Sequence, residues 1–98
     1  YNIYPKELEE ILDDQDGVLE SAVIGVPHND FGETPVAVIV QETKMVPDLK
    51  IINNNLIKSL ARYKHPKKII LVDELPRNTM GKVQKNILRN EYKDLFTN

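Results

Sequence analysis

The spacing of hydrophobic positions near the start of the chain is that of an amphipathic helix. Leu8, Ile11 and Leu12 fall on one face of a helix with about 3.6 residues per turn. Pro5 suits the first helical turn, and Gly17 is the residue at which we expect the helix to stop. The pattern therefore predicts a short extended segment followed by a helix that runs from Pro5 toward Gly17.

Three β-rich runs follow along the chain. Residues 18–27, VLESAVIGVP, and residues 34–41, TPVAVIVQ, are rich in valine and isoleucine, which favour strands. The intervening HNDFGE supplies Asn, Asp and Gly, which are typical of turns. A third strand is predicted at 67–72, KKIILV, directly after Pro66.

Two more helices are predicted, one before and one after the third strand along the chain. From Pro47 to about Tyr63, apolar residues recur at helical spacing, although asparagines 53–55 weaken this helix. These apolar residues are Ile52, Leu56 and Leu60. A last apolar stripe consists of Leu88, Tyr92, Leu95 and Phe96.

This order of elements predicts an α+β fold in which helices pack on a small three-stranded sheet. A chain of 98 residues suits one domain, and 41% hydrophobic with 29% charged residues is typical of a folded protein. There are no cysteines, which excludes disulfides and thiolate metal sites. No apolar run approaches the roughly 18 residues of a membrane span, so no membrane segment is expected. The start, YNIYPKELEE, lacks Met, and we interpret the chain as a piece of a longer protein.

Charge is distributed unevenly between the two parts of the chain. Residues 1–57 hold 3 Lys/Arg and 11 Asp/Glu, a net −8, whereas residues 58–98 hold 10 and 4, a net +6. The excess of positive charge indicates either that an anion binds the C-terminal part or that basic residues cover solvated helix faces. A nucleic acid is not the expected anion, because the total charge is −2, aromatics are few and no nucleic-acid-binding module is visible.

The candidate chemistry lies in residues 76–89, PRNTMGKVQKNILR. A P-loop is excluded, because its first glycine and its Ser/Thr are replaced by Pro76 and Val83. Local chemistry leaves two interpretations of Lys82. It is an idle surface lysine, or its ammonium enters the cleft of a neighbouring domain and stabilises an anionic transition state. Gly81 permits the positive φ that such a turn requires.

Four segments, in order, resemble the C-terminal domain of the adenylate-forming superfamily, which includes acyl-CoA synthetases, peptide-synthetase adenylation domains and luciferases. They are YNIYPKELEEIL, VLESAVIGVPHNDFGETPVAVIV, LARYKHPKKIILVDELP and ELPRNTMGKVQKNILR, and together they span essentially all of the chain. Within this superfamily the chain is most similar to malonyl-CoA synthetases, through YNIYP and PRNTMGKVQKN. The resemblance implies that residues 1–98 are the small C-terminal domain, or lid, of an acyl-CoA synthetase.

The resemblance also implies an activity with two steps. A small carboxylic acid, with malonate as the expected one, reacts with MgATP to give an acyl-adenylate, and the thiol of coenzyme A then displaces AMP. A large N-terminal domain outside this chain would bind most of the ATP and the acid. The lid would turn between two poses, and the isolated lid is expected to be folded but inactive.

Site residues are carried over from the family by position. Lys82 matches the catalytic lysine, whose charge would bridge the carboxylate and the α-phosphate. Asn2 falls where relatives place a polar or cationic side chain near the adenylate phosphate, and Tyr1 begins the segment that lines the thioester-forming site. Gly81 is grouped with them as a cofactor-binding residue. For Asn2, a merely structural place at a strand edge is the alternative.

Basic residues near the end of the second predicted helix are candidates for the phosphates of coenzyme A. Lys58, Arg62 and Lys64 lie there, with Lys64 as the first choice, although the helix dipole alone also favours basic residues at this end. No single position matches a strict motif.

Three further positions have mainly structural expectations. Glu7 and Glu9 belong to the first recognised segment, and we expect them to favour the helix N-terminus. His28 is expected to cap a turn. Its alternative is a structural cation bound partly through backbone carbonyls, and no zinc site is expected, because His65 is far away in the sequence.

Two other interpretations stay open. One is a non-enzymatic interaction module with the same fold, and the other is the lid of a peptide-synthetase adenylation domain. Residues 76–82 also fit the Pro-x-x-x-x-Gly-Lys pattern that acetyltransferases recognise in bacterial relatives, so a lysine acetyltransferase that modifies Lys82 is a possible partner. The expected location is the cytoplasm, or the mitochondrial matrix in a eukaryote.

Overall fold

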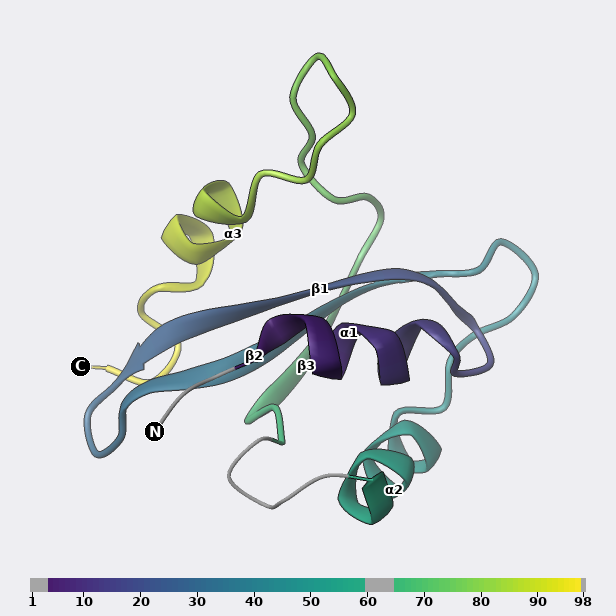
Figure 1. The fold of residues 1–98 in the computed structure, drawn as a ribbon, viewed down its shortest axis with the longest axis horizontal. Coiled ribbons are helices and arrows are strands. Elements are labelled where there is room, and N and C mark those ends of the chain that lie inside the picture. Colours follow the sequence, from purple (N-terminus) through teal and green to yellow (C-terminus); the bar gives the residue numbers. More distant parts are fainter. Residues whose placement is uncertain (1–3, 60–64, 98) are drawn as a thin grey trace.

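The computed structural model describes residues 4–59 and 65–97, and in these residues three helices surround one three-stranded sheet (Figure 1). The elements are α1 (Pro5–Asp13), β1 (Val18–His28), β2 (Gly32–Gln41), α2 (Leu49–Ser59), β3 (Lys68–Val72) and α3 (Lys85–Tyr92). β1 and β2 form an antiparallel hairpin, and β3 lies parallel to β2 on its other edge. The predicted α+β class is confirmed, while the predicted extended segment at residues 1–3 lies outside the described residues.

β2 is the centre of the domain. It has a neighbouring strand on each edge, and every residue from 34 to 40 is buried. Because successive side chains of a strand point to opposite faces, this burial requires cover on both faces of the sheet. The apolar run TPVAVIVQ is therefore the signature of a central strand with helices on both sides.

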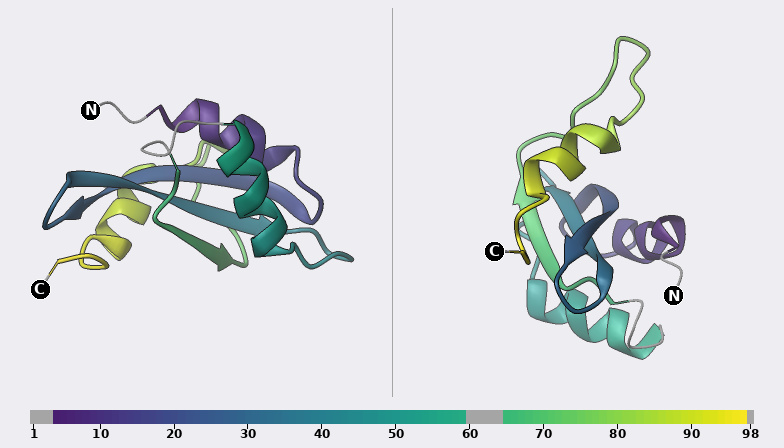
Figure 2. Two further views of the ribbon diagram at one scale, coloured as in Figure 1. Left: turned by 90° about the horizontal axis from the view of Figure 1, so that it is seen from below. Right: turned by 90° about the vertical axis from the view of Figure 1, so that its left-hand side faces the viewer.

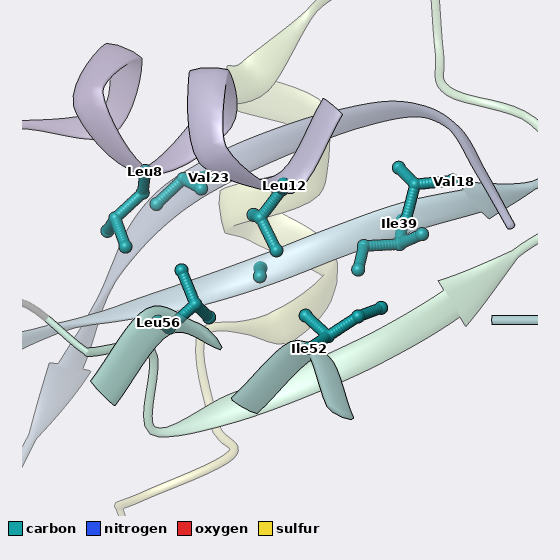
Figure 3. Close-up of a cluster of buried hydrophobic side chains, with 8 residues drawn as sticks. Leu8, Leu12, Val18, Val23, Ile39, Ile52 and Leu56 are labelled. Atoms are coloured by element: carbon teal, nitrogen blue, oxygen red, sulfur yellow. The ribbon is translucent and has the colours of Figure 1, made fainter. Parts of the chain in front are cut away.

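α1 and α2 cover one face of the sheet (Figure 2, right; Figure 3). α1 contributes Leu8 and Leu12, and α2 contributes Ile52 and Leu56. The strand residues that pack against these four side chains are Val18, Val23, Ala37 and Ile39. Helical spacing in the sequence placed these apolar residues on the buried face of each helix, as predicted.

α3 covers the opposite face together with the chain that follows it (Figure 2, right). Leu88 is buried in this second cluster, and Tyr92, Leu95 and Phe96 pack around its margin. The last apolar stripe is only partly helical, because α3 ends at Tyr92. The N–H of Leu95 donates to the carbonyl of Tyr92 in a turn, and Phe96 forms a β-bridge with His28, which keeps both side chains on the core.

The prediction that α1 stops at Gly17 is wrong by four residues, since the helix ends at Asp13. Asp14 and Asp16 are poor helix formers, and their negative charge is unfavourable near a helix C-terminus. Gly17 instead adopts φ +86° in the turn that leads into β1.

α2 begins at Leu49, two residues later than the predicted start at Pro47. Asp48 acts as the N-cap, because its Oδ1 accepts hydrogen bonds from the N–H groups of Lys50 (3.0 Å) and Ile51 (3.2 Å). The helix is described as far as Ser59, and its predicted continuation to Tyr63 lies outside the described residues. No helix in the described part of the chain is long and apolar enough to span a membrane.

We predict that Gly17→Ala destabilises the domain much more than Gly32→Ala. Both glycines have positive φ, +86° and +75°, which costs an alanine about 1–2 kcal/mol. A Cβ at Gly17 would also lie 2.7 Å from the Cα and N of Pro47, whereas at Gly32 it would meet nothing within 4 Å. We expect Gly17→Ala to lower the free energy of unfolding by about 2–4 kcal/mol and Gly32→Ala by about 1 kcal/mol. Urea denaturation of the 98-residue chain measures both, and equal losses would contradict the close packing of Gly17 on Pro47.

Candidate functional site

Lys82 lies on a loop between β3 and α3 that projects beyond the helices and the sheet (Figure 1, top; Figure 2, right). We call residues 77–83 the lysine loop. The chain on either side of it is held in the second hydrophobic cluster by Leu75 and Leu88, both of which are buried. The loop therefore has a fixed base and an exposed tip.

The backbone of the lysine loop closes as a small hairpin. Arg77 and Val83 form an antiparallel β-bridge. The N–H of Asn78 donates to the carbonyl of Lys82 (2.9 Å), and the N–H of Gly81 donates to the carbonyl of Asn78 (3.0 Å). Gly81 has φ +82°, so the prediction that this glycine supplies a positive φ is confirmed.

The side chain of Asn78 adds two hydrogen bonds inside the hairpin. Its Oδ1 accepts from the backbone N–H of Met80 (3.0 Å) and from that of Lys82 (2.9 Å). Asparagine is favoured in turns because its side chain bonds to backbone groups nearby in the sequence. The tip of the loop is nevertheless exposed to solvent, and Met80 is 90% exposed.

Arg77, the first residue of the lysine loop, links the loop to the sheet. Its Nη1 donates to the carbonyl of Gly81 (2.6 Å), and its Nη2 forms an ion pair with Glu20 of β1. One guanidinium thus holds the tip and the body at the same time, which its fixed fork of donors allows.

Glu9 of α1 links the start of α3, just after the lysine loop, to the rest of the domain. Its Oε2 lies 2.7 Å from Nζ of Lys85, the first residue of α3, and accepts the N–H of Val23 (2.8 Å). β1 is an edge strand, so some of its N–H groups face away from β2 and need another acceptor. The expectation that Glu9 merely favours the start of α1 is therefore wrong: its carboxylate joins α1, β1 and α3. Glu7 does lie in the first turn of α1, as expected.

Lys82 is left with an available charge. Its backbone N–H and carbonyl are bonded to Asn78, but its side chain is exposed and forms no ion pair with the described residues. An ammonium in this position can meet an anion that approaches the tip of the loop. A projecting loop cannot enclose a substrate by itself, so a complete site needs a second surface opposite Lys82.

Of the candidate cofactor-binding residues outside the lysine loop, only Lys58 lies among the described residues. Tyr1, Asn2 and Lys64 lie outside the described residues, as does Arg62. Lys58 is exposed in the last turn of α2. α2 covers the face of the sheet opposite α3, so the structure does not bring Lys58 and Lys82 together (Figure 1).

His28 lies at the end of β1, far from the lysine loop in the fold, and takes part in a turn. Its Nδ1 accepts the N–H of Asp30 (3.0 Å), and its ring stacks on Phe31 with centroids 4.3 Å apart. The ring of Phe96 lies 5.4 Å away, and Nζ of Lys67 lies 5.1 Å from the centre of the Phe31 ring. This is a turn-capping arrangement, and the described residues contain no group of three His, Asp or Glu side chains that could hold a metal ion.

Comparisons with known proteins agree on one family. Residues 7–82 match the family described as the AMP-binding enzyme C-terminal domain. The long-chain-fatty-acid–CoA ligase FadD13 of Mycobacterium tuberculosis is 41% identical over 91 residues, which cover 93% of this chain and 18% of that protein. A 2-succinylbenzoate–CoA ligase of Listeria monocytogenes is 42% identical over 92 residues, 93% of this chain and 19% of that protein. The crystal structure of ATP-bound MatB from Rhodopseudomonas palustris superposes with a TM-score of 0.94 at 54% identity, over 99% of this chain and 19% of that one.

The fold and the projecting lysine loop define a small α+β domain of the adenylate-forming type. The chain belongs to the AMP-binding enzyme C-terminal domain family, and the matched segment ends at Lys82. The family assignment from four sequence segments is thereby confirmed. The chain spans 18–19% of the length of the three relatives named above.

We predict that Glu9→Ala destabilises the domain more than Glu10→Ala, an exposed neighbour on the same helix. Removal of the Glu9 carboxylate leaves the Val23 N–H and the Lys85 ammonium without their acceptor. We expect a loss of about 1.5–3 kcal/mol for Glu9→Ala, as for hydrogen bonds to charged groups, and less than about 0.5 kcal/mol for Glu10→Ala.

A thermal or urea unfolding series that includes Lys85→Ala and the double variant measures the coupling between Glu9 and Lys85. Strictly additive losses would show that the two side chains do not interact in solution.

Proposed function

We propose that this chain is the lid domain of an ATP-dependent acyl-CoA ligase and that it supplies Lys82 to the adenylation step. The observation that carries the proposal is the placement of Lys82, whose side chain is exposed on a hydrogen-bonded, projecting loop. Lys82 is also the last residue of the segment that matches the family. The two curated relatives named above are CoA ligases, and the MatB structure contains ATP, which supports ATP and coenzyme A as reactants.

In the proposed first step, a carboxylate oxygen attacks the α-phosphorus of ATP. The new C–O–P linkage forms as the bond between the α-phosphorus and the bridging oxygen breaks, and pyrophosphate leaves with the electron pair. The Lys82 ammonium would lie between the two anionic reactants and stabilise the charge that develops on the phosphoryl oxygens. In the second step, the sulfur of coenzyme A attacks the acyl carbon and the thiol proton is released. The C–S bond of the thioester forms as the bond between the acyl carbon and the phosphate oxygen breaks, and AMP leaves with the electron pair.

The remaining parts of the site are assigned to the rest of the full-length protein. A large N-terminal domain would hold ATP, the acid and Mg²⁺, since this chain corresponds to only 18–19% of the length of the relatives named above. Malonate is the proposed acid, because the segments YNIYP and PRNTMGKVQKN resemble those of malonyl-CoA synthetases. The curated relatives named above act on a long-chain fatty acid and on 2-succinylbenzoate, so a panel that includes these acids tests the choice.

We predict that Lys82→Ala in the full-length protein lowers the rate of adenylate formation by about 10²- to 10³-fold. Formation of the thioester from supplied acyl-adenylate should change little, because the charge of Lys82 is used in the first step only. Pyrophosphate release with ATP, Mg²⁺ and malonate measures the first step, and CoA consumption with the purified adenylate measures the second.

Lys93→Ala is the matched control, since Lys93 is an exposed lysine just beyond α3 and has no part in the proposed site. Equal losses in both steps, or no loss in either, would contradict the role of Lys82. Transfer to a carrier protein in place of coenzyme A would instead favour the lid of a peptide-synthetase adenylation domain.

We also propose that an acetyltransferase can modify Lys82, because residues 77–82 are exposed and the segment 76–82 fits the Pro-x-x-x-x-Gly-Lys pattern. Acetylation removes the charge and should reduce adenylation as much as Lys82→Ala does. The check is incubation of the full-length protein with such an acetyltransferase and acetyl-CoA, followed by mass spectrometry of the peptide. An unmodified Lys82 would end this proposal.

A further inference from the structure

Asn78 takes part in four hydrogen bonds within the lysine loop. Its Oδ1 accepts from the N–H groups of Met80 and Lys82, at 3.0 and 2.9 Å. Its own N–H donates to the carbonyl of Lys82 (2.9 Å), and its carbonyl accepts the N–H of Gly81 (3.0 Å). Both backbone polar groups of Lys82 are therefore bonded to this one residue.

The loop needs such bonds because its tip is exposed, although the Arg77 guanidinium adds one further bond there, to the carbonyl of Gly81. Thr79, Met80 and Gly81 are exposed, and Gly81 has more backbone freedom than any other residue type. Each hydrogen bond of this kind contributes about 0.5–1.5 kcal/mol, so the pair made by the Asn78 side chain is large enough to select one conformation of a short loop.

Fixing the backbone of Lys82 matters for the chemistry proposed above. Electrostatic stabilisation of a transition state requires a charge that is in place before reaction, and a displacement of about 1 Å can cost about 10²-fold in rate. The lysine stem is long and flexible, so its ammonium is placed only as well as the Cα from which the stem starts.

We propose that Asn78 is a positioning residue for Lys82: its side-chain carbonyl oxygen holds the lysine loop in the conformation that directs the Lys82 ammonium to the reacting phosphate. This inference rests on the proposed function of Lys82. Arg77 assists by bonding to the carbonyl of Gly81 and to Glu20, which fixes the direction of the whole loop relative to β1.

The test uses the full-length protein with Asn78→Ala, Asn78→Ser and Thr79→Ala. We expect Asn78→Ala to lower the kcat of adenylate formation by about 10- to 100-fold, with KM values for ATP and the acid changed less than about threefold. A serine hydroxyl can accept the same bonds more weakly, so Asn78→Ser should give an intermediate rate. Thr79→Ala is the matched control, because the Thr79 side chain makes no hydrogen bond within the described part of the chain.

Two measurements separate positioning from a general loss of structure. Thioester formation from supplied acyl-adenylate should stay within about twofold of the parent rate in every variant, whereas a damaged lid would slow both steps. In the Lys82→Ala background, Asn78→Ala should cause no further loss, because Asn78 acts through Lys82. Full adenylation activity in Asn78→Ala, or an additive loss in the double variant, would overturn the inference.

The parallel Lys82→Ala measurement distinguishes the two proposals. A normal rate of adenylation in Lys82→Ala would remove the proposed function itself. A collapse in Lys82→Ala together with a normal rate in Asn78→Ala would leave the function standing and remove only the positioning role.

Discussion

A continuous apolar strand needs cover on both of its faces, and residues 34–40 of β2 impose this requirement on the whole domain. α1 and α2 meet it on one face and α3 on the other, so the two helical layers are separated by the thickness of the sheet. The base of the lysine loop is part of this cover, because Leu75 and Leu88 are buried in the second layer. The position of Lys82 thus depends on the same burial that holds the sheet together.

Ion pairs within the domain partly neutralise the uneven charge of the sequence. Glu9 and Glu20, from the acidic part of the chain, pair with Lys85 and Arg77, which flank the lysine loop in the basic part. Two of the basic residues whose charge suggested an external anion are therefore paired within the domain. Lys82, between them, has none among the described residues. Lys82 is thus one of the cations of this half that stay available to an external anion, as do the exposed Lys58 and Lys93, which also form no ion pair with the described residues.

Features that depend on residues close together in the chain could be predicted from the sequence. The three strands, the buried faces of the helices and the positive φ of Gly81 follow from periodicity and residue type. The helix ends were less accurate, because Asp48 and Asp14 act through capping and charge that compete with propensity. The ion pairs of Glu9 and Glu20 had no local signal, since the partners Lys85 and Arg77 are more than 50 residues away. Asn78 was visible as a turn residue, but its bonds to Lys82 depend on the closed hairpin.

The separation of the two layers also bears on the proposed role as a lid. Lys82 is carried on the α3 side of the sheet and Lys58 on the α2 side. In the proposed function, Lys58 would meet the phosphates of coenzyme A and Lys82 those of ATP, and a turn of the domain between the two steps would present each side of the sheet in succession. A loop whose backbone is bonded by Asn78 and Arg77 suits such a role, because the Cα of Lys82 would keep its position within the domain while the domain turns as a unit. That turn would deliver or withdraw the charge of Lys82, and the loop itself would need no rearrangement.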